Sequence, residues 1–119
     1  MSDAGARWTT RPLALPAAMT LDTTGGGTLE LGPPPAGEAW LIARLAVTTG
    51  GALVPEVRVY RNSARTENFV DGTSAGDADV SEYATPLRLS GGDVLVLVWT
   101  GGTAGARGSV TAQGTRERT

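Results

Sequence analysis

The segment Asp93–Thr100, which reads DVLVLVWT, constrains the fold most. In a β-strand its apolar side chains point to two opposite sides: Val94, Val96 and Val98 to one, and Leu95, Leu97 and Trp99 to the other. A strand in a small antiparallel sheet normally needs only one apolar face. We therefore predict that a second copy of the chain or another protein covers the second face.

The rest of the chain alternates apolar and polar residues in short runs separated by Gly and Pro turns, and no run has helical periodicity. This pattern predicts an all-β domain of about seven or eight strands, a β-sandwich or a jelly roll, with both topologies left open. In the run 38–49, alternation places Leu41, Ala43, Leu45 and Val47 on one face. It places Trp40 and Ile42 on the opposite face.

Three regions are expected along the chain. Residues 1–17 contain Pro12 and Pro16, which favour extended backbone, and they predict an N-terminal arm with Trp8 and Leu13 as anchors. Residues 18–115 form the β-sandwich domain, and residues 116–119 form a charged tail. A disordered terminus is the alternative for the first region.

The chain has no histidine and no cysteine. It therefore lacks the commonest general base, the commonest metal ligand and any thiolate, and we predict that it is not an enzyme. Its net charge of −2 argues against nucleic acid as a partner. The start carries no signal-like apolar run and no segment reaches about 18 apolar residues, so synthesis in the cytoplasm and no membrane partner are expected.

One acidic loop offers a weak possibility of Ca²⁺ binding, through Asp71, Asp77 and Asp79. The third ligand, the glycine and the distal glutamate of a calcium loop are missing, so a solvated loop is the favoured interpretation. The glycine-rich segment 101–106 lacks the lysine of a phosphate-binding loop and is expected to form a hairpin turn.

Tryptophan is enriched at the centres of protein interfaces, so Trp99 is open to two interpretations, core packing or partner binding, whereas Trp40 is expected in the core or at its edge. The predicted interface set is Trp8, Leu13, Trp40, Val94, Val96, Val98 and Trp99. Four arginines are candidates to surround it: Arg58, Arg61, Arg65 and Arg88.

Segments 35–42 (PAGEAWLI) and 86–102 (PLRLSGGDVLVLVWTGG) resemble those of small virion proteins of tailed bacteriophages from GC-rich hosts. The resemblance covers residues 18–113. It implies a β-sandwich or jelly-roll module that decorates a capsid or sits at the neck, the tail or a fibre attachment point. It also implies a location in the virion, a trimer or other homo-oligomer, and contacts with other virion proteins.

The second hypothesis is a carbohydrate-binding module or a receptor-binding tip for a surface glycan. It requires a row of exposed aromatic side chains, for which Tyr60, Tyr83 and Trp8 are the candidates. A third, weaker hypothesis is a cytoplasmic enzyme subunit or a regulatory β-barrel.

Overall fold

The short alternating runs of the chain fold as antiparallel strands in two stacked sheets. The computed structural model describes residues 10–74 and 79–119. The strands in this part of the chain are β1 (Thr10–Thr20), β2 (Gly27–Leu31), β3 (Glu38–Thr49), β4 (Glu56–Arg61), β5 (Phe69–Ser74), β6 (Asp79–Ser90), β7 (Leu95–Thr100) and β8 (Arg107–Arg118). A short 3-10 helix, η2 (Thr66–Asn68), lies between β4 and β5.

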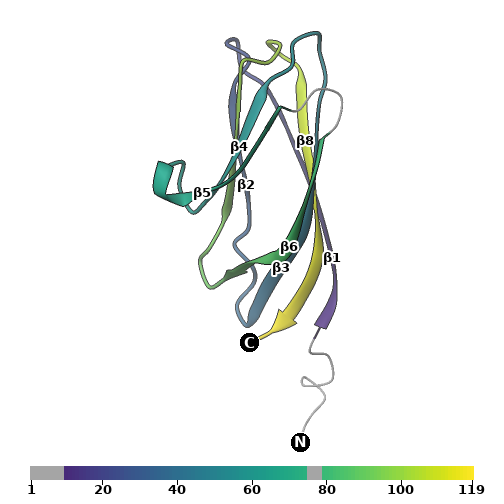
Figure 1. Ribbon diagram of the computed structural model, residues 1–119, viewed down its shortest axis with the longest axis vertical. Coiled ribbons are helices and arrows are strands. Elements are labelled where there is room, and N and C mark those ends of the chain that lie inside the picture. The colour runs from purple at the N-terminus through teal and green to yellow at the C-terminus, as the bar shows by residue number, and fades with distance from the viewer. Residues whose placement is uncertain (1–9, 75–78) are drawn as a thin grey trace, which may run out of the picture.

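The strand order identifies a jelly roll. Sheet A has the order β1-β8-β3-β6, and sheet B has the order β2-β7-β4-β5. The first strand pairs with the eighth, the second with the seventh, the third with the sixth and the fourth with the fifth. The chain is thus one long antiparallel hairpin rolled into two facing sheets. The all-β sandwich predicted from the sequence is confirmed, and Figure 1 shows the two layers.

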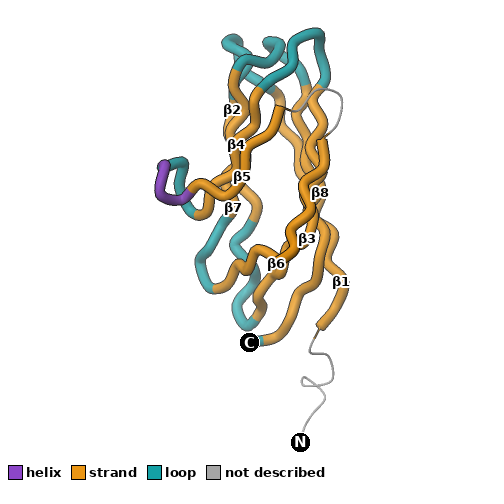
Figure 2. Tube along the Cα trace, viewed as in Figure 1, coloured by secondary structure: helices purple, strands orange, loops and turns teal. Residues whose placement is uncertain are grey.

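Figure 2 shows the two sheets facing each other. The core lies between them and is built from the inward side chains of both. On β7 these are Leu95, Leu97 and Trp99, each fully buried. On β1 they are every second residue from Leu13 to Met19, which explains the alternating burial of that strand, and Leu21 directly after it also enters the core. Trp99 is the largest buried side chain, and its indole N–H donates a hydrogen bond of 2.9 Å to Oγ1 of Thr49 on sheet A.

Strand β3 does not keep one alternation along its length. Its pairing with both neighbours shifts between Ile42 and Arg44, which marks a β-bulge at Ala43. The bulge reverses the alternation, so Trp40 and Ile42 before it and Leu45 and Val47 after it all enter the core. The sequence-based prediction that placed these two pairs on opposite faces was therefore wrong.

The strand bounds also differ from the predicted region boundaries. Residues 10–17 belong to β1, which pairs with β8 over its whole length, from Thr10 opposite Glu117 to Thr20 opposite Arg107. They form the edge strand of sheet A rather than an arm. Likewise, β8 continues to Arg118, so most of the predicted tail is strand. Residues 1–9 of the predicted arm, including Trp8, lie outside the described residues.

Gly114 on β8 lies directly opposite the bulge, paired with Ile42. A Cβ atom at this position would stand 1.9 Å from the carbonyl oxygen of Leu41. We expect Gly114→Ala to lower the free energy of unfolding by about 3 kcal/mol or more, because backbone rather than a flexible side chain must move. Urea denaturation followed by tryptophan fluorescence measures the change.

The matched control is Gly92→Ala, because a Cβ atom at Gly92 meets no atom within 4 Å. This variant should stay within about 1 kcal/mol of the wild type. Equal stabilities for the two variants would contradict the structural role assigned to Gly114.

Candidate functional site

The predicted interface residues fall into three groups in the structure. Leu13, Trp40 and Trp99 are buried in the core between the sheets, so Trp99 packs within its own chain. Val96 and Val98 follow the opposite alternation on β7 and lie on the outer face of sheet B, and Val94 comes directly before the strand. Trp8 lies outside the described residues. The inward side of β7 is therefore the leucine and tryptophan side, and the valines are left for the surface.

The chain covers this outer valine side only in part. Glu30 of β2 and Tyr60 of β4 flank Val96 across the sheet, and the Val96 residue is only 4% exposed to solvent. Val98 lies between Thr28 and Arg58 and is half-buried, as is Val94. The prediction that an outside partner must cover the whole face is thus too strong, because neighbouring side chains already bury its centre.

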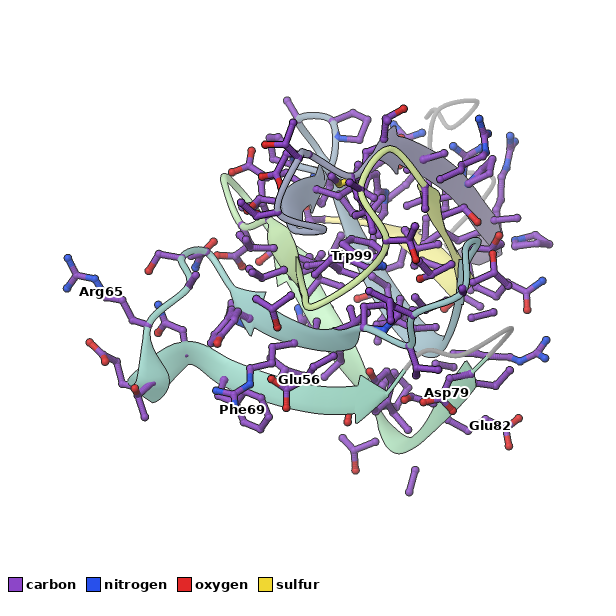
Figure 3. The ribbon with its side chains drawn as sticks, turned by 90° about the horizontal axis from the view of Figure 1, so that it is seen from above. Glu56, Arg65, Phe69, Asp79, Glu82 and Trp99 are labelled. Atoms are coloured by element: carbon purple, nitrogen blue, oxygen red, sulfur yellow. The ribbon has the colours of Figure 1, made fainter. Side chains whose placement is uncertain are left out.

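An aromatic pair lies beside the valines. The rings of Tyr60 and Phe69 meet edge to face with their centroids 5.8 Å apart. The ring of Phe69 reaches over Gly72, where a Cβ atom would come within 3.1 Å of it. Phe69 is nevertheless 50% exposed. Figure 3 shows it on the far side of sheet B from Trp99. We call Tyr60, Phe69, Val94, Val96 and Val98 the valine–aromatic face.

Charged residues of both signs border the valine–aromatic face. Glu30 is exposed on β2, on one side of β7. Arg58 is exposed on β4, on the other side, and its Nε lies 3.0 Å from Oε1 of Glu56. Of the four arginines expected around such a patch, Arg88 lies instead on sheet A, where it pairs with Glu117 of β8.

The loop between β4 and β5 rises beside this face and carries η2 and Arg65 away from the sandwich (Figures 1 and 3). Asn62 starts it in the left-handed conformation, at φ +71°. The Asn62 side chain donates to Asp93 at 3.2 Å and accepts from the Val94 N–H at 3.0 Å. These contacts fix the base of the loop to the turn that precedes β7.

A second exposed apolar group lies at one end of the sandwich. Leu53 and Val54, in the loop between β3 and β4, are 58% and 61% exposed. The loop is held in place because the Leu53 N–H donates to Oγ1 of Thr103 in the loop between β7 and β8. The sequence pattern did not single out these two residues, because two apolar residues before a proline resemble the start of a strand.

The acidic segment does not gather its carboxylates in the described part of the chain. Asp71 accepts a hydrogen bond from the Tyr83 hydroxyl at 3.0 Å and one from the Gly72 N–H. Burial, followed by the nearby Asp71 carboxylate, raises the pKa of Tyr83. Asp79 accepts the N–H of Val80. No group of three or more possible metal ligands occurs among the described residues, and Asp77 lies outside them.

The aromatic candidates for sugar binding are likewise not aligned. Tyr60 presents its ring to Phe69, whereas Tyr83 bridges the sheets through its bond to Asp71. In the structure, Phe69 replaces them as the exposed ring. The sequence signal for it was available, since Phe69 and Val70 are the large apolar residues of an otherwise polar stretch.

Comparison with protein-family models and with curated proteins finds no match to this chain. Across residues 10–74 and 79–119, no helix is long and apolar enough to span a membrane. The candidate site is therefore identified from the structure alone. It is the valine–aromatic face of sheet B, which has charged residues on both sides and the β4–β5 loop beside it.

The turn that supports this face should respond to acid. Asp93 accepts the N–H of Ser90 and the Asn62 amide, and Arg61 lies 3.5 Å away. The Ser90 hydrogen bond, then the Asn62 bond, lower the pKa of Asp93 from its ordinary value of 3.8. A lowered pKa means that ionised Asp93 stabilises the fold above the unfolded-state pKa, and that this stabilisation is lost as the pH falls through the folded-state pKa.

We therefore expect the wild type to be more stable than Asp93→Asn at about pH 6, with the difference shrinking towards about pH 3. Urea denaturation at a series of pH values measures it. A difference that stays constant over this range would show that the ionised form of Asp93 has no special role in the turn.

Proposed function

We propose that this protein is a non-enzymatic structural protein that assembles as an oligomer on the capsid or tail of a tailed bacteriophage. The observation that supports assembly is the valine–aromatic face, where Phe69 stays half-exposed beside half-buried valines. Exposed aromatic side chains beside other partly exposed apolar residues are typical of binding surfaces. The virion context comes from the sequence resemblance at segments 35–42 and 86–102.

The jelly roll suits this role for a physical reason. Its core is filled by side chains from both sheets, so the faces and the end loops are the parts available for binding. The fold hosts many unrelated functions, and support for the proposal therefore comes from the face and not from the topology.

Purified particles of the phage that encodes this chain test the proposal. We expect the chain to be present in stoichiometric amounts by mass spectrometry of washed particles. An antibody against it should label one defined region, head or tail, in electron micrographs. A chain found only in the soluble lysate and never on particles would overturn the virion role.

The sugar-binding alternative gives a different result. Binding of the isolated chain to a glycan array, lost in Phe69→Ala, would favour a receptor-binding module, since an exposed aromatic ring is the part of this face that stacks on sugars. Absence of binding both with and without Ca²⁺ would exclude that alternative for the glycans tested.

A further inference from the structure

We infer that Pro12 and Pro16 close the free edge of β1, so that a second copy of the chain does not extend sheet A by pairing with it. β1 is the first strand of sheet A, and its partner among the described strands is β8. An edge strand presents a row of backbone N–H and C=O groups with which another chain can pair. The inference concerns how this fold limits its own association, and it does not depend on the virion role.

The register of β1 shows which of its N–H groups point to the free edge. The N–H of Leu21, directly after the strand, donates to the carbonyl oxygen of Ala106 at 2.8 Å. The pairing of β1 with β8 has no shift along the strand, and Leu21 opposite Ala106 continues it. Such bonds recur at every second residue of an antiparallel ladder. The odd-numbered residues of β1 therefore direct their N–H groups to β8, and the even-numbered residues direct theirs away from it.

Both prolines of the strand are even-numbered. Pro12 and Pro16 are exposed, and each places its ring where the free edge would otherwise have an N–H donor. The remaining donors on that edge belong to Thr10, Ala14, Ala18 and Thr20. An incoming antiparallel strand needs a donor at every second residue, and the two prolines leave only the Ala14 N–H between them. The edge therefore cannot form a continuous ladder with another strand.

β1, which lies wholly within the described residues, has no other protection of this kind. Exposed edges are commonly protected by charged side chains, by bulges or by being very short. β1 is 11 residues long, its pairing has no bulge, and its one charged residue, Arg11, lies near its beginning. The stretch 13–20 reads LALPAAMT, and an apolar, uncharged stretch of this kind favours pairing with other strands when proline is absent.

The opposite edge of sheet A is interrupted in a different way. The pairing of β6 with β3 shifts there, so that residues 83–86 of β6 stand opposite Ala43 alone. The shift leaves two separate short segments, 79–82 and 87–90, as the edge. Neither edge of sheet A thus offers a long unbroken row to a partner strand. Contacts between copies are left to the faces and the end loops of the sandwich.

The variant Pro12→Thr/Pro16→Thr restores both missing N–H groups and tests the inference by sedimentation velocity over a concentration series. Its average mass should rise to about twice that of the wild type at the same concentration, because two opened edges can pair around a twofold axis. Pro35→Thr is the matched control: Pro35 is exposed in the connector between β2 and β3, outside any strand, and this variant should sediment as the wild type does. Circular dichroism checks that the variants fold.

A third substitution tests whether the added association occurs at this edge. Ala14 is exposed midway between the two prolines. Ala14→Lys, added to the double variant, places a lysine of each copy close to that of the other when the two β1 strands pair, and like charges oppose pairing. The average mass should therefore return to the wild-type value.

Hydrogen exchange of the wild type, followed by NMR, tests the geometry without any variant. The Leu13 and Leu15 N–H groups, which point to β8, should exchange at least about tenfold more slowly than that of Ala14, which points to the free edge. In the double variant, the Ala14 N–H should become protected as the concentration rises.

Three results would overturn the inference. The first is a folded double variant that sediments as the wild type does, and the second is an association that Ala14→Lys leaves unchanged. The third is an Ala14 N–H in the wild type that exchanges as slowly as those of Leu13 and Leu15, which decides the question even if the double variant does not fold. None of these results bears on whether the chain is found on phage particles.

Discussion

The bulge in β3 opposite Gly114 is the constraint on which the rest of the sandwich depends. Strand β3 lies inside sheet A, between β8 and β6, and is 12 residues long. Without the bulge, a strict period of two would turn either Trp40 and Ile42 or Leu45 and Val47 out of the core. The bulge needs close approach of the neighbouring strand, and Gly114 permits it because no side chain separates it from the Leu41 carbonyl. The absence of a side chain at Gly114 thus lets both halves of β3 bury their apolar residues.

A second close approach joins the sheets. Gly108 of β8 lies against the indole of Trp99, where a Cβ atom would stand 3.1 Å from the ring. Thr49 accepts the indole N–H, which would otherwise be a buried donor without a partner. Trp99 therefore fills the gap between the sheets instead of serving as an interface anchor. With the larger residues of β7 used inside, its valines are left to form the centre of the outer face, and the proposed assembly contact is a consequence of how the core is filled.

Sequence patterns predicted the β-sandwich because alternation and turn residues are local signals. They located the strand that is apolar on both sides, but they did not decide which side faces inward: Val94, Val96 and Val98 were expected to supply a core face and were also included in the predicted interface, whereas the structure buries Leu95, Leu97 and Trp99. They did not assign the faces of β3, since a bulge changes the period through one residue and leaves no distinct mark in composition. They also treated Pro12 and Pro16 as signs of an arm. Both are exposed in an edge strand, four residues apart on the same side of it, which is where a sheet tolerates proline.

The sequence by itself determined the class of fold, the positions of most turns and the presence of one strand that is apolar on both sides, because each depends on residues close together in the chain. Only the tertiary structure decided the jelly-roll order, the inward direction of Leu95, Leu97 and Trp99, and the pairing of Tyr60 with Phe69. These depend on strands that are far apart in sequence and meet only in the folded sheets. The same is true of Glu30 and Arg58, whose positions on either side of β7 exist only once three strands have paired.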